Sequence, residues 1–165
     1  MRDYTLHYFL RPDHRDVGDL WMASGRHGAA HVQADAGRRW LFLHLENLHR
    51  DGAQTTCAID SRTGGLAGFV TLVPDTGWLD QIIVARTVRG SGVATLLLDE
   101  AKRLSPGSIE VDVAEDNSRA IRFCEREGFR KTGLAARAPG GGRMWKLRWI
   151  AGEGETPPEQ GDWCA

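Results

Sequence analysis

The fold of this chain is decided by the stretch Trp78-Leu79-Asp80-Gln81-Ile82-Ile83-Val84-Ala85-Arg86-Thr87-Val88-Arg89-Gly90-Ser91-Gly92-Val93-Ala94-Thr95. Its first seven residues form an apolar, β-branched run that predicts a buried strand. From Val93 to Leu104 apolar residues recur at helical spacing, and Ser105-Pro106-Gly107 ends the predicted helix. A glycine-rich turn between a strand and a helix N-terminus suits an anion, because unpaired N–H groups and the positive end of the helix dipole point at it. The stretch therefore predicts a cofactor that carries phosphate.

Three classes of such cofactor use a turn of this kind, and spacing separates them. A nucleoside-triphosphate loop needs Gly-Lys-Ser/Thr to reach the outer phosphates and Mg²⁺, and the sequence has no such tripeptide. A dinucleotide-binding turn needs a third glycine where this chain has Thr95. Glu110 and Asp112 stand at about the distance of a ribose-binding acid, so the dinucleotide alternative stays open. The third class is acyl-CoA.

Two segments together favour acyl-CoA. Arg89-x-x-Gly92-x-Ala94 resembles the pyrophosphate-binding motif of the GNAT superfamily of acyl-CoA-dependent N-acyltransferases, Gln/Arg-x-x-Gly-x-Gly/Ala. The segment from Asp112 to Phe129 resembles the other half of the GNAT core, in which a strand ends, an Asn opens a helix and Gly-Phe closes it. Gly128 suits a left-handed C-cap, and we expect Phe129 to start the next strand. The resemblance covers residues 78 to 133 and says nothing of the substrate.

The resemblance implies an α/β fold, a single-domain GNAT-like mixed sheet flanked by helices with two parallel central strands. In that family these strands splay apart, and the pantetheine arm bonds to the backbone of the earlier one. Acetyl-CoA is then the expected co-substrate, with no metal. The implied cofactor-binding residues are Ile82, Ile83, Val84, Arg89, Gly90, Ser91, Gly92, Val93, Ala94, Thr95 and Asn117.

Composition bounds the remaining possibilities. The 165 residues suffice for one domain with a real core, which we place at residues 1–150, before an expected disordered tail at 151–165. The net charge of −1 argues against nucleic acid as a partner. Three cysteines without a spacing pattern indicate a reduced compartment, and the absence of a signal peptide or long apolar run favours a cytoplasmic location and no membrane.

Patterns elsewhere predict the order β-α-α-β-β-β-α-β-α-β-β. The elements expected outside the two GNAT-like segments are a strand over 4–11, a helix near 16–22, a loop over 24–35, a helix over 37–49, strands over 55–60 and 66–73, and a final strand over 144–150. On the helix over 37–49, Trp40, Leu41, His44, Leu45 and Leu48 share an apolar stripe, which makes His44 a core or pocket-rim residue.

Acyl transfer to an amine needs a neutral amine, a polarised thioester carbonyl and a protonated leaving thiolate. An amine of pKa near 10.4 is neutral only about once in 2,500 at pH 7, a cost of about 4.6 kcal/mol, so a base is useful. Asp112 stands five residues before Asn117, where some GNAT members carry an acid in this role, and Asp80 on the cofactor strand is the other candidate. Backbone N–H groups can polarise the carbonyl.

The general acid is where the chain departs from the family. Many GNAT enzymes have a Tyr seven residues after the Asn, and this chain has Cys124 there. A thiol near pKa 8.5 can donate a proton, but a small hydrophobic cysteine in the core is the commoner case and the one we favour.

We therefore expect an acetyl-CoA-dependent N-acetyltransferase acting on a primary amine of a small molecule or peptide, and by analogy a homodimer. Two alternatives remain: a non-catalytic acyl-CoA-binding or regulatory module, favoured by Cys124, and a dinucleotide-binding oxidoreductase. His27, His31, His44 and His49 cluster in the region that forms the acceptor side in GNAT relatives, without the spacing of a metal site.

Overall fold

In the computed structural model the described residues are 3–9, 14–24, 34–136 and 141–153. The elements in chain order are β1 (Tyr4–Tyr8), α1 (His14–Ala23), α2 (Ala34–Arg50), β2 (Gln54–Asp60), β3 (Leu66–Val73), β4 (Trp78–Val84), the 3₁₀ turn η2 (Arg86–Val88), α3 (Val93–Leu104), β5 (Ser108–Ala114), α4 (Ser118–Arg126), β6 (Arg130–Leu134) and β7 (Met144–Ile150). The predicted order of strands and helices is confirmed, and so is the predicted mixed α/β fold.

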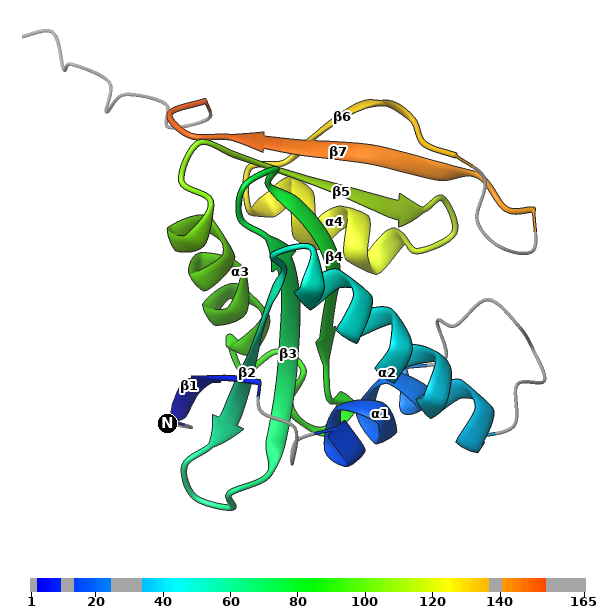
Figure 1. Cartoon of the computed structure of the whole chain (residues 1–165). Helices are drawn as coiled ribbons and strands as arrows, with labels where there is room; N and C mark the ends of the chain where they lie inside the picture. Colours follow the sequence, from blue (N-terminus) through cyan, green and yellow to red (C-terminus); the bar gives the residue numbers. More distant parts are fainter. Residues whose placement is uncertain (1–2, 10–13, 25–33, 137–140, 154–165) are drawn as a thin grey trace, which may run out of the picture.

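The strands form one sheet in the order β1-β2-β3-β4-β5-β7-β6. Neighbours are antiparallel except for β4 and β5, which are parallel because α3 crosses over between them. Figure 1 shows α1 and α2 together on one side of β2–β4, and α3 and α4 on the other. Each side has its own apolar cluster, centred on Phe69 and Leu41 under α1 and α2, and on Leu97 and Ile109 under α3 and α4.

The two parallel strands meet at one end only. The parallel register pairs Trp78 with Glu110, and the Glu110 N–H donates to the Gly77 carbonyl at 2.9 Å. Beyond this point β4 continues to pair with β3 and β5 with β7, so the two strands diverge as Figure 1 shows. The divergence opens the sheet beside Ile82, Ile83 and Val84, on the edge of β4 that faces away from β3.

Boundaries of several elements differ from the sequence-based expectation. Helix α2 starts at Ala34, so the loop expected over 24–35 is wrong for its last two residues; Asp35 fits the first turn of a helix, where its charge complements the dipole. Phe129 does not start a strand, because its N–H donates to the Cys124 carbonyl and closes α4 together with Gly128 at φ +92°. The predicted C-cap at Gly128 is confirmed. Residues 10–13 and 25–33, and the expected tail from 154 onward, lie outside the described residues.

Candidate active site

The turn that precedes α3 presents bare backbone to open space. Gly90 and Gly92 have φ values of +79° and +87°, and a Cβ on either would meet no atom within 4 Å. Gly92 is the N-cap of α3, and among the described residues no side chain makes a capping hydrogen bond there. Within the described part of the chain, no acceptor is found for the N–H groups of Val93, Ala94 and Thr95. An uncapped helix N-terminus behind left-handed glycines is a ready anion site.

Two hydroxyls in this turn are already engaged in holding its shape. The Ser91 hydroxyl donates to the Val88 carbonyl and lies 2.8 Å from the Tyr4 hydroxyl on β1. The Thr95 hydroxyl donates to a carboxylate oxygen of Glu127 at 3.0 Å, which ties α3 to the end of α4. These side chains therefore fix the turn, and the backbone is the part left to bind an anion.

A β-bulge in β4 places two polar side chains, those of Asp80 and Gln81, on the α2 side of the sheet. In the register with β3, Thr71 pairs with Gln81 and Leu72 with Leu79, so Asp80 is an extra residue. Because of this insertion Leu79 and Ile82 both pack in the cluster under α3 and α4, although they are three positions apart. Asp80 consequently faces α2.

The Asp80 carboxylate meets His44 of α2. Its Oδ2 lies 2.9 Å from His44 Nε2, and the Asp80 side chain is 13% exposed against 30% for His44. The hydrogen bond to Asp80 raises the pKa of His44 above 6.5, against the lowering effect of burial. Sequence reasoning placed each residue on the correct element but did not pair them. The three-residue spacing of the apolar residues Leu79 and Ile82, which breaks the two-residue alternation of a strand, was the available signal of the bulge.

Aromatic rings extend this pair along the α1–α2 side. The His44 ring stacks on Trp40 with centroids 4.8 Å apart and planes at 11°, and Trp40 stacks on buried Trp21 of α1 at 5.4 Å. Trp40 itself is 52% exposed, so it is a surface ring and not part of the core stripe predicted for this helix. The stack contacts the face of the imidazole, and the His44 side chain remains 30% exposed.

Asp112, the other candidate base, lies in a charged cluster on β5 and β7. Its Oδ1 is 3.4 Å from Lys146 Nζ, and that ammonium also donates to Glu110 at 2.9 Å and lies over the ring of Trp78. The hydrogen bond to Glu110 raises the pKa of Lys146, so the lysine stays charged beside the two carboxylates. Asp112 is thus already in an ion pair with a lysine that it shares with Glu110.

Cys124 and Asn117 lie on α4. The Cys124 thiol is buried in the cluster under α3 and α4, and burial, with a smaller contribution from Glu127, raises its pKa to about 11. This environment agrees with the core role that we favoured. The Asn117 side chain accepts the Ala120 N–H at 3.2 Å and caps the helix; its implied contact with the cofactor remains a prediction.

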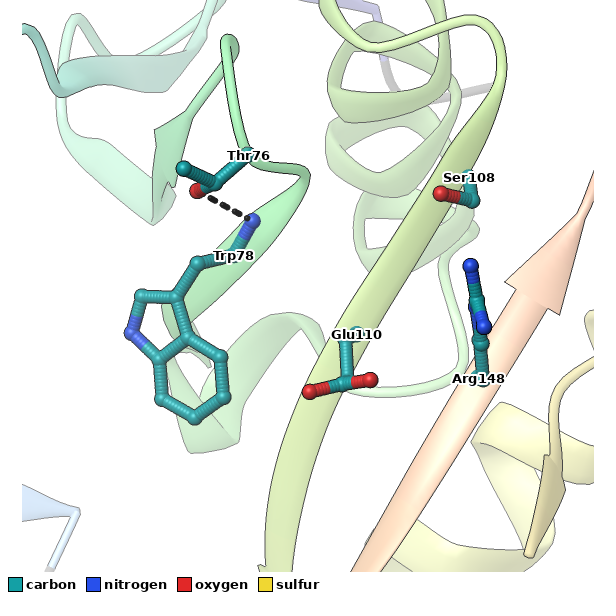
Figure 2. A pocket seen from close by; sticks show the side chains of 5 residues that line it. All are labelled: Thr76, Trp78, Ser108, Glu110 and Arg148. Atoms are coloured by element: carbon teal, nitrogen blue, oxygen red, sulfur yellow. Dashed lines mark hydrogen bonds between the residues drawn. The ribbon is translucent and has the colours of Figure 1, made fainter. Parts of the chain in front are cut away.

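A polar pocket of about 260 Å³ lies where β4 and β5 are still paired, at the opposite end of β4 from the glycine turn. Figure 2 shows its lining of Thr76, Trp78, Ser108, Glu110 and Arg148, with the Trp78 N–H donating to the Thr76 hydroxyl. Because this end of the sheet is closed, the pocket is separate from the opening beside Ile82–Val84.

The remaining histidines do not join the His44–Asp80 pair in the described part of the chain. His49 bonds to the Thr55 hydroxyl at 2.8 Å, on the same helix as His44, while His27 and His31 lie outside the described residues. Among the residues that the structure describes, no group of three or more His, Cys, Asp or Glu side chains could hold a metal ion. Nor does any helix in these ranges have the length and apolar character needed to cross a membrane.

Comparison with known proteins identifies the family. A model of the acetyltransferase (GNAT) family matches residues 7–129. The chain belongs to this family. The predicted family is thus confirmed, and membership supports the predicted acetyl-CoA-dependent transfer of an acetyl group to an amine.

Individual relatives are between 20% and 33% identical to this chain over the aligned residues. Peptidyl-lysine N-acetyltransferase YjaB of Salmonella typhimurium is 33% identical over 66 residues, which are 40% of this chain and 43% of that protein. The match therefore spans less than half of the relative's length. The solution structure of apo-form YjaB from Escherichia coli has a TM-score of 0.66 at 21% identity, covering 90% of this chain and 99% of that one. The spermidine N-acetyltransferase of Vibrio cholerae, in complex with CoA and spermine, has a TM-score of 0.70 at 20% identity, covering 91% and 96%. Both confirm the GNAT fold.

Proposed function

We propose that this GNAT protein transfers the acetyl group of acetyl-CoA to the primary amine of a small molecule or peptide. The observation that carries the proposal is the uncapped N-terminus of α3, with Gly90 and Gly92 in left-handed conformations, next to the opening between β4 and β5. A long cofactor that ends in a pyrophosphate fits this combination: the turn 89–95 takes the phosphates, and the arm runs along the free edge of Ile82–Val84.

The acceptor is proposed to approach from the α2 side of β4. Asp80 and His44 face this side directly beside the cofactor strand, and the exposed ring of Trp40 lies next to them. A carboxylate and an aromatic face both favour a cationic amine. The names of two relatives, one acting on peptidyl-lysine and one on spermidine, support an acceptor of this chemical class.

The CoA thiolate needs no dedicated general acid to leave. A thiol of pKa near 8.5 leaves readily as a thiolate, so water can supply its proton at neutral pH. The buried thiol of Cys124, whose pKa is raised to about 11, fits a packing role better than that of a general acid. The amine is the group that needs help, and we assign its deprotonation to the Asp80 side of the site in preference to Asp112, which Lys146 holds.

The experiment is acetyl transfer by the purified protein. Acetyl-CoA is mixed with a panel of amines that includes a diamine, a polyamine and a lysine peptide, free CoA thiol is followed over time, and products are identified by mass spectrometry. We expect turnover with at least one class of amine. Binding of acetyl-CoA without turnover on any of them would favour the non-catalytic module, and thermal protection by NAD(P) instead of CoA would favour the oxidoreductase.

The assembly and location belong to the same proposal. We propose a cytoplasmic homodimer, on the analogy with GNAT proteins and the composition of the chain. Light scattering coupled to size-exclusion chromatography tests the dimer, since a monomer of 18.2 kDa would be readily distinguished from it.

A further inference from the structure

The pair formed by His44 and Asp80 has the geometry of an oriented base. We propose that the His44 imidazole, and not the Asp80 carboxylate itself, takes the proton from the acceptor amine, with Asp80 as the positioning residue behind it. This inference rests on the proposed acetyl transfer and names the group that prepares the amine for attack.

Access distinguishes the two side chains. The Asp80 carboxylate is the more buried, and its Oδ2 is occupied by His44 Nε2 at 2.9 Å. The imidazole is the more exposed of the two and is bonded to that oxygen from α2. A proton that enters from the α2 side therefore meets the imidazole before the oxygen bonded to it.

The hydrogen bond also fixes which nitrogen is basic. When His44 is neutral, the acceptor Oδ2 of Asp80 holds the remaining proton on Nε2, so the lone pair is on Nδ1. In the described ranges no hydrogen bond to Nδ1 is found. The stacked ring of Trp40, 4.8 Å away and nearly parallel, keeps the imidazole from turning. The arrangement thus presents one free, oriented lone pair.

The charges around His44 favour a base that works near neutral pH. From β4 it faces Asp80, which raises its pKa; the buried thiol of Cys57 lies below α2 on β2. On α1, the Asp19 carboxylate is bonded to Arg38 of α2. Farther along the same side of the sheet, Glu110 and Asp112 are held by Lys146. A base is most effective when its pKa lies close to the working pH, and Asp80 raises the pKa of His44 from its ordinary value of 6.5.

The proposed step moves two protons from the acceptor nitrogen. The ammonium of the acceptor gives one proton to Nδ1 of neutral His44, and the amine lone pair attacks the thioester carbonyl. The C–N bond forms, the C–S bond breaks, and the second proton lost by nitrogen ends on the CoA sulfur, directly or through water. The imidazolium returns its proton to solvent, to which a 30% exposed side chain has access.

The test compares pH profiles of kcat/KM for the wild type, His44→Asn and Asp80→Asn. We expect the wild-type profile to rise through an ionisation above pH 6.5. His44→Asn should remove this ionisation and lower kcat/KM roughly a hundredfold or more at pH 7.5, the usual scale for a general base. Asp80→Asn keeps the imidazole but replaces the charged partner, so the ionisation should persist and move to lower pH.

Controls separate this mechanism from structural damage. His49→Asn changes another histidine of α2 that is bonded to a threonine, and it should leave the profile in place. NMR titration of the His44 ring in the wild type and in Asp80→Asn measures the same shift in pKa without turnover. The pKa of His44 can therefore be obtained even from a variant with low activity.

Opposite results overturn the inference. If Asp80→Asn abolishes the ionisation while His44→Asn retains it, Asp80 is itself the base. If both variants keep the wild-type profile, neither residue handles the proton. A wild-type protein without turnover on any amine refutes the proposed function instead, so the two failures are distinguishable.

Discussion

A negative charge placed at Gly92 tests the cofactor site most directly. Gly92 caps α3 at φ +87°, and a side chain there would point into open space beside the first-turn N–H groups. Asparagine and aspartate both tolerate this left-handed conformation and have the same shape. Gly92→Asp and Gly92→Asn therefore share any steric and backbone cost and differ by one charge.

The expected difference follows from Coulomb's law. A pyrophosphate on the N-terminus of α3 would lie about 5 Å from the new carboxylate, and at an effective dielectric near 20 one repulsion costs about 3 kcal/mol, more than a hundredfold in affinity. The same carboxylate is favourable for the helix itself, because it lies at the positive end of the dipole. The aspartate variant should thus be folded at least as stably as the asparagine variant while binding acetyl-CoA far more weakly.

Calorimetric titration with acetyl-CoA, at two salt concentrations, measures this difference. The gap between the variants should narrow at higher salt, because the site is open to solvent. If both folded variants bind acetyl-CoA at low salt as tightly as the wild type does, the placement of the pyrophosphate at this turn is refuted. A large loss in both variants, with no difference between them, would mean that the side chain blocks the turn sterically and that charge plays no part.

Three further outcomes are expected. Cys124→Ala should keep turnover within a few-fold in steady-state kinetics and lower the free energy of unfolding by about 1 kcal/mol, as for removal of one buried atom group; a hundredfold loss of turnover would make the thiol the acid. Asp112→Asn should leave the ionisation that limits kcat/KM at its wild-type position, because Lys146 already holds that carboxylate; a loss of rate that shrinks at alkaline pH would restore it as the base. The His44–Asp80 pair should stabilise the fold fully below pH 6.5 and lose this contribution as the pH rises through the raised pKa of His44. In urea unfolding, the free energy of unfolding of His44→Asn should therefore lie further below that of the wild type at pH 6 than at pH 8.

The backbone elements were predictable because local sequence and tertiary packing agree. Strand β4 and helix α3 have the predicted bounds, since the β-branched run, the glycines and Ser105-Pro106-Gly107 each favour the observed structure. The end of α4 shows the limit of such reasoning. Phe129 is apolar and follows a turn glycine, which suits a strand start equally well, and only the bond from its N–H to Cys124 shows that it completes the helix cap.

The site was harder to predict because its geometry depends on one inserted residue. Simple alternation along β4 puts Asp80 on the same face as Ile82 and Val84, which pack with α3 and α4. The bulge turns Asp80 to the other face, where α2 supplies His44. That partner is 36 positions earlier in the chain, and no local pattern relates the two. The aromatic stack on Trp40 was hidden for the same reason, since the helical stripe suggested a core ring.

The bulge also explains how one strand can serve two ligands. A regular strand gives alternate side chains to its two faces and uses both backbone edges for pairing. In the described part of the chain, the edge of β4 toward β5 makes no strand pairing beyond Trp78, so its backbone is available to a cofactor arm. The bulge places the consecutive side chains of Asp80 and Gln81 on the α2 side. The proposed acyl donor and the proposed acceptor then approach the same strand from its edge and from its face. Such an arrangement brings an amine and a thioester together on one strand. The same strand carries both the side chain that positions the base and the backbone edge that holds the cofactor.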